Sequence, residues 1–167
     1  MSRLVDVLRN HIEYTTWATN RLLHACEALT DDQLQQDFGT ADKSVRGTMV
    51  HLFRAERTWL QRLQFGTPKI PWATPEDESW PFLTEHWPIL YKQWQSWAAE
   101  LTEEDPDRVI HYSDLKGRAW SQPIWALVLH VVNHSTHHRG QVSGFLRALG
   151  QTPPSLDFIF FVREKTK

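Results

Sequence analysis

The stretch His130-Val-Val-Asn-His134-Ser-Thr-His137-His138-Arg-Gly-Gln141 holds four of the nine histidines of the chain. His134 and His138 are four residues apart, which on an α-helix corresponds to about 400° of rotation and a rise of about 6 Å. Both imidazoles therefore leave the same face of the helix and can share one metal ion. The same spacing also arises by chance, and a histidine on an apolar helix face is often a hydrogen-bonded core residue.

The residues on either side of these histidines predict a long helix. We expect Ser121 to cap its start, with Pro123 in the first turn, and Gly150 to close its end. The histidines then lie in the middle of the helix and face inward. Apolar residues recur at helical intervals at Ile124, Val128, Val131, Val132, Val142, Phe145, Leu146 and Leu149.

A third candidate ligand, His51, lies on a second predicted helix, which begins after Ser44 and ends near Gly66. Helices in a bundle pack about 8–10 Å apart, near enough for His51 to join the other two imidazoles on one ion. Three nitrogen ligands make an open site, whereas structural zinc is closed by four ligands. The apolar stripe of this helix consists of Val45, Met49, Leu52, Trp59 and Leu63.

Cys26 is the single cysteine of the chain, which excludes a closed, cysteine-rich metal site. It lies four residues after Leu22 on the first predicted helix. We therefore expect a small buried side chain rather than a reactive thiol, and a reducing compartment.

Four long helical patterns, and a small β-hairpin before the last of them, predict an all-α domain. The first helix spans roughly residues 2–29 and the third starts between Thr84 and Pro88. The hairpin strands are expected at 108–112 and 119–120. Large aromatic residues on the helical stripes are expected to fill the core, namely Trp59, Trp87, Trp94 and Trp97.

Residues 67–81 contain four prolines and read as an irregular connection. Trp72 and Trp80 lie in this connection, where exposed aromatic side chains often cover a pocket or a partner. The sequence leaves two alternatives for them, a pocket wall and a dimer contact.

The composition indicates a single domain, which we assign to residues 1–167. This length is typical of one domain with a substantial core. A net charge of −2 gives no basic footprint for nucleic acid. There is no signal segment at Met1 and no run of about 18 apolar residues, so we expect a cytoplasmic protein with no membrane partner.

Four motifs of the chain together match one known family. They are Asn133 to Gln141, His51 with Ala55-Glu56 and Trp59-Leu60, Tyr14-x-x-Trp17-Ala18, and Leu149-Gly150-x-x-Pro153 with Asp157. On these motifs the chain resembles the DinB-like (DinB/YfiT) metalloprotein family. The resemblance implies a four-helix bundle in which His51, His134 and His138 bind a divalent metal, for which zinc or nickel suits nitrogen ligands. One departure is visible, because the family pattern Trp-Ala-Asn reads Trp-Ala-Thr-Asn at residues 17–20, which moves the amide about 100° around the helix.

The other histidines of the cluster are weaker candidate ligands. His130, His134 and His138 span about 12 Å of helix, too far for one ion, so His130 is expected to line the site or to support its ligands. His137 lies about 100° around the helix from His138 and is a less favourable ligand, although its spacing from His134 leaves it open.

Four further residues are expected to support the site or to line its pocket. Glu56 lies on an apolar stripe, where an unpaired carboxylate is costly. We prefer a buried partner for it, either Arg139, Tyr14 or a histidine N–H, over a role as catalytic base. Tyr14, Trp17 and His130 are expected to line a solvent-accessible pocket at the metal.

The chain offers no catalytic triad, phosphate loop or dinucleotide fingerprint, so a metal is the candidate catalyst. The resemblance implies a use for it, since bacillithiol transferases and the mycothiol-dependent maleylpyruvate isomerase bind a low-molecular-weight thiol at the metal. The resemblance therefore implies a metal-dependent thiol transferase or hydrolase acting on a small molecule. The alternative is a non-catalytic, stress-related protein that binds a metal or small ligand. The resemblance also implies a homodimer.

Overall fold

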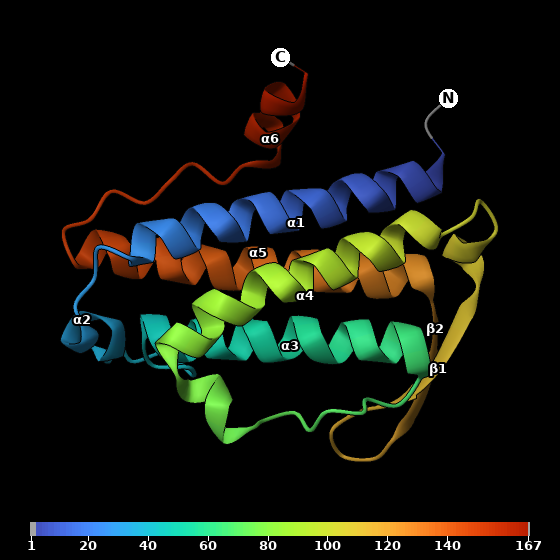
Figure 1. The fold of residues 1–167 in the computed structure, drawn as a ribbon, viewed down its shortest axis with the longest axis horizontal. Helices are drawn as coiled ribbons and strands as arrows, with labels where there is room; N and C mark the ends of the chain where they lie inside the picture. Colours follow the sequence, from blue (N-terminus) through green and yellow to red (C-terminus); the bar gives the residue numbers. More distant parts are fainter. Residues whose placement is uncertain (1–2, 167) are drawn as a thin grey trace.

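The computed structural model describes residues 3–166, and its four long helices form a bundle (Figure 1). α1 packs against α4 and α5, and α3 packs against the same two helices. The all-α bundle predicted from the sequence is therefore confirmed. The long helices are α1 (Leu4–Cys26), α3 (Val45–Phe65), α4 (Trp80–Glu100) and α5 (Ile124–Ala148).

The core consists of the apolar stripes of these four helices. Trp87, Trp94 and Trp97 are buried as predicted, and Trp59 is partly buried against the core. Cys26 is fully buried, and burial raises the pKa of its thiol to about 12, in agreement with an unreactive side chain. Among the described helices, none combines the length and the apolar character needed to cross a membrane.

The direction of the helices determines the course of the connection between α3 and α4. α1 and α5 run one way and α3 and α4 the other (Figure 1). Because α3 and α4 are parallel, the chain must return along the length of α3, about 30 Å for its 21 residues, before α4 can begin. Residues 66–79, which we call the strap, make this return beside α3 and include the 3-10 helix η1 (Pro75–Glu78).

Capping residues and glycines explain where α3 begins and where α3 and α5 end. The Ser44 hydroxyl accepts a hydrogen bond from the Gly47 N–H and caps α3, as predicted. α3 ends at Gly66, whose φ is +73°. α5 ends before Gly150, whose φ is +76°, and the N–H of Gln151 donates to the carbonyl of Leu146. Glycine at these positions supplies a conformation that other residues rarely adopt.

A hairpin, two short α-helices and the 3-10 helix η2 (Asp105–Asp107) complete the described chain. β1 (Val109–Ser113) pairs antiparallel with β2 (Ala119–Pro123), which confirms the predicted hairpin. α2 (Asp31–Gln35) begins at a capping box formed by Thr30 and Gln33. The remaining short helix is α6 (Phe158–Lys165), which packs against α1.

The structure corrects three boundaries. α4 begins a turn earlier than predicted, because Ser79 caps it and Pro81 occupies its first turn. Ser121 does not cap α5, because it belongs to β2 and its hydroxyl pairs with Nδ1 of His111. Pro123 precedes α5 as its N-cap residue instead of lying in its first turn.

Substitution of Gly66 by alanine is expected to destabilise the fold. A Cβ at this position would lie 2.9 Å from the His111 carbonyl oxygen, and the backbone has positive φ. Chemical denaturation should show a loss of about 1–3 kcal/mol for Gly66→Ala. In the control Gly144→Ala, the added Cβ meets no atom within 4 Å inside α5, so stability should stay the same or rise. Equal stability of the two variants would contradict this explanation.

Candidate metal centre

The antiparallel packing of α3 against α5 brings His51, His134 and His138 together. Nε2 of His134 lies 3.1 Å from Nε2 of His51 and 3.2 Å from Nε2 of His138. One ring nitrogen from each histidine lies within 4.8 Å of those of the other two. Two nitrogens bound to one tetrahedral zinc ion lie about 3.3–3.4 Å apart. The two distances from Nε2 of His134 are close to this value, so the three histidines could hold a metal ion.

The environment of the cluster keeps His134 and His138 neutral. Burial, followed by the neighbouring charges of His138 and His51, lowers the pKa of His134 to about 3. Burial and the charge of His51 also lower the pKa of His138. At neutral pH these two rings are uncharged and expose lone pairs, as a metal ligand requires.

The outer ring nitrogens face polar side chains that orient the imidazoles. Nδ1 of His138 lies 2.8 Å from Oε1 of Gln141, and since the amide oxygen accepts, Nδ1 carries the proton and Nε2 is left free. The carboxylate of Asp42 lies 3.7 Å from Nδ1 of His51 and 3.8 Å from Nδ1 of His138. Carboxylates behind metal-bound histidines fix their orientation and raise their basicity.

The position of Asp42 depends on a close approach between its loop and α3. A Cβ on Gly47 would lie 2.0 Å from the carbonyl oxygen of Asp42. The next residue, Lys43, has φ of +63°, and the N–H of Ser44 donates to the carbonyl of Asp42 across this tight turn. A non-glycine residue with positive φ stores strain, which here holds Asp42 beside the histidines.

Asp42 was not among the predicted site residues. It lies outside any helical stripe, and its contact with α5 spans nearly one hundred residues of sequence. The spacing between Asp42 and Gly47 carries no recognised motif. Gln141 does close the histidine run, and its spacing of three from His138 is the signal that could have identified it.

Glu56 is fully buried behind the metal centre, as predicted, but its partners differ from those expected. Its carboxylate accepts hydrogen bonds from the Ser135 hydroxyl at 2.7 Å and from Nε1 of Trp87 at 3.2 Å. Burial raises the pKa of Glu56, while the Ser135 hydrogen bond and the charge of Arg139 oppose this rise. Ser135 follows His134 directly, so Glu56 ties α3 to α5 at the level of the histidines.

Tyr14 and Trp17 lie between α1 and α6, and the structure does not bring them to the metal histidines. The Tyr14 hydroxyl donates to the carbonyl of Leu156, and Nε1 of Trp17 donates to Glu164. Both residues pack against Phe161 of α6. We expected these two residues to line a pocket at the metal, whereas they contact α6, a helix that the sequence pattern did not reveal.

Arg139 also points away from the histidines. Its guanidinium donates to the hydroxyls of Thr19 and Thr136 and lies over the Tyr14 ring. Thr19 is buried and Asn20 is exposed, so the family's amide position is occupied here by a hydroxyl that binds arginine.

Two other histidines and two tryptophans surround the cluster. The ring of His130 lies 5.8 Å from that of His134 and 4.9 Å from that of Trp59, so it lies beside the cluster. His137 is exposed and lies outside the three-nitrogen group. The Trp72 ring meets that of His51 at 5.7 Å, which favours the pocket wall over the dimer contact for this residue.

The fold and this geometry define a helical-bundle protein with a three-histidine cluster. The family model described as the DinB family matches residues 1–166, so the chain belongs to the DinB family. A similar solved structure is that of a DinB-like protein from Bacillus cereus ATCC 10987, with 22% identity and a TM-score of 0.59 over 87% of this chain and 94% of that chain. That similarity shows the shared fold. No curated protein gives a significant match.

Alanine substitution of any one of His51, His134 and His138 is expected to remove most of the bound metal, because each contributes one of three ligands. Metal content should be measured by elemental analysis after dialysis. His137→Ala is the matched control, since it removes a neighbouring imidazole that lies outside the cluster, and should keep its metal. Stoichiometric metal in a His134→Ala, His138→Ala double variant would contradict this assignment.

Asp42→Asn is expected to weaken metal binding about 10- to 100-fold, because the amide keeps the shape but loses the charge that faces Nδ1 of both histidines. Competition with a chromophoric chelator measures the affinity. Asp32→Asn, on the exposed surface of α2, is the control and should bind like the unaltered protein. An unchanged affinity for Asp42→Asn would show that this carboxylate does not support the ligands.

Proposed function

We propose that this DinB family protein is a metal-dependent S-transferase that binds one divalent ion, zinc or nickel, and presents it to a low-molecular-weight thiol. The observation that carries the proposal is the convergence of three imidazole nitrogens without a thiolate or carboxylate among them. With neutral ligands, a bound ion would retain its full charge, keep a position open and favour the ionised form of a thiol placed there.

The side chains around the cluster support this use. Asp42 and Gln141 lie at the outer ring nitrogens of His51 and His138, whose Nε2 atoms both face Nε2 of His134. The rings of Trp72 and His130 flank the cluster and supply walls for a small organic molecule. Glu56 is fully buried and already bonded to Ser135 and Trp87, which suits an anchor better than a catalytic base.

The overall reaction class follows from the nucleophile. The thiol loses its proton to solvent, and its sulfur attacks an electrophilic carbon of a second small molecule. A carbon–sulfur bond forms while the bond from that carbon to its leaving group breaks, and the leaving group departs with the electron pair. No oxidant or reductant is needed.

Thiol binding can be tested with cobalt-substituted protein. A thiol that ligates the ion should produce a sulfur-to-cobalt absorption band. Its binding should release about one proton per site near neutral pH, measured by calorimetry in buffers of different ionisation enthalpy. The thiols to compare are bacillithiol, mycothiol, glutathione and simple thiols. The His134→Ala variant should give neither signal.

Absence of both the band and the proton release with every thiol would contradict the proposal. Hydrolysis by an activated water, or metal binding without catalysis, would then be the function to test.

A further inference from the structure

The strap passes close to the metal centre because it is bound along one face of α3. Oε1 of Gln61 accepts hydrogen bonds from the N–H groups of Lys69 and Ile70 at 2.7 and 2.9 Å. Nη2 of Arg57 donates to the carbonyl of Trp72 at 3.1 Å. Gln61 and Arg57 lie four residues apart, so successive turns of α3 hold successive residues of the strap.

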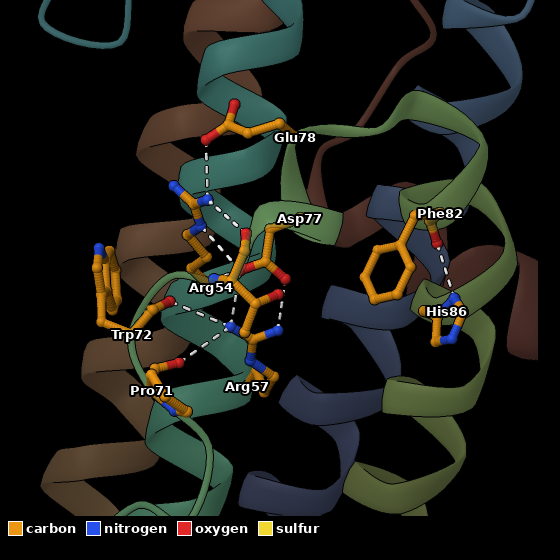
Figure 2. A network of polar contacts seen from close by, with 9 residues as sticks. Arg54, Arg57, Pro71, Trp72, Asp77, Glu78, Phe82 and His86 are labelled. Carbon is orange, nitrogen blue, oxygen red and sulfur yellow. Dashed lines mark hydrogen bonds and ion pairs between the residues drawn. The ribbon is translucent and has the colours of Figure 1, made fainter.

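Asp77 fastens the end of the strap. Its carboxylate is fully buried and accepts hydrogen bonds from Arg57 at 2.6 and 2.9 Å, from Nε of Arg54 at 3.0 Å and from the N–H of Thr74 at 2.8 Å. These hydrogen bonds hold the pKa of Asp77 at about 2 despite its burial. Figure 2 shows Arg54 and Arg57 pointing from α3 to this carboxylate, and Arg57 also donating to the carbonyl of Trp72.

This network gives the strap one conformation. A buried carboxylate with two guanidinium partners is costly to separate from either of them. The strap is therefore a fixed wall beside α3 rather than a mobile loop, and its backbone is held directly at the residue nearest to the cluster.

That residue is Trp72. Arg57 binds both the Asp77 carboxylate and the carbonyl of Trp72, an arrangement that we call the Arg57–Asp77 clamp, and the position of Trp72 follows from it. Its ring meets the ring of His51 at 68° with centroids 5.7 Å apart. Trp72 and His51 are both only partly buried. If a thiol bound the metal beside His51, the carbon atoms next to its sulfur would lie close to the indole ring of Trp72.

We propose that Trp72, held in place by the Arg57–Asp77 clamp, determines the specificity of the metal centre and selects thiols that carry a flat, unsaturated group next to the sulfur. This inference rests on the proposed function. The aromatic pair preference predicts that such a thiol binds about threefold to tenfold more tightly than a saturated thiol of the same size.

Two thiols of matched size, which differ in whether the ring is flat and unsaturated, test the proposal: benzyl mercaptan and cyclohexylmethanethiol. Their dissociation constants are read from the sulfur-to-cobalt band of the cobalt-substituted protein. The ratio of the two constants should favour benzyl mercaptan by about threefold to tenfold, and Trp72→Leu should bring it close to one. Trp125→Leu removes an exposed tryptophan of α5 and should keep the original ratio.

The clamp is tested by the same ratio. Asp77→Asn should lower it toward one while cobalt stays bound, since the carboxylate does not touch the histidines. Gln61→Leu is a second and milder variant, because it releases the Lys69 and Ile70 amides and leaves the buried ion pairs intact. It should lower the ratio in the same direction, so the test survives if Asp77→Asn does not fold.

The outcomes distinguish thiol binding at the metal from the role of Trp72 and from the role of the clamp. A missing band with every thiol in the unaltered protein overturns the proposed function and this inference with it. A clear band with equal constants for the two thiols, or a ratio unchanged by Trp72→Leu, overturns the role of Trp72 alone. A ratio lost in Trp72→Leu but kept in both strap variants overturns the role of the clamp.

Discussion

The antiparallel packing of α3 against α5 is the constraint on which the site depends. α3 contributes His51, and α5 contributes His134 and His138, so neither helix alone can form the cluster. The buried hydrogen bond between Glu56 and Ser135 joins the same two helices next to the histidines. The helices are thus bonded where the ligands must converge, and a small shift of one against the other would separate the nitrogens.

Topology supplies the surroundings of the cluster. Because α3 and α4 are parallel, the chain must cross the length of α3, and the strap carries Trp72 past His51 on the way. The loop that precedes α3 in the sequence carries Asp42 to Nδ1 of His51 and of His138. Connections between helices therefore provide both the electrostatic support behind the ligands and an aromatic wall beside them.

The sequence predicted what depends on local periodicity. The four long helices and the pairing of His134 with His138 follow from spacings of three and four residues. The hairpin follows from strand and turn signals, and the addition of His51 follows from the distance at which helices pack. Contacts made across long sequence distances could not be read in this way. Asp42 reaches the site because Lys43 adopts a positive φ and because Gly47 has no side chain to block the Asp42 backbone. Tyr14 faces α6, a short apolar helix without a long stripe, so its pattern gave no indication that the helix would cover α1.

The central claim is that one metal ion is held by three Nε2 atoms between α3 and α5. Anomalous diffraction at the zinc absorption edge, from crystals of zinc-loaded protein, tests it most directly. We expect one strong peak about 2.0–2.1 Å from Nε2 of His51, His134 and His138, with Nδ1 of His138 still hydrogen-bonded to Gln141. A peak coordinated by other residues, or by Nδ1 atoms of these histidines, would contradict it.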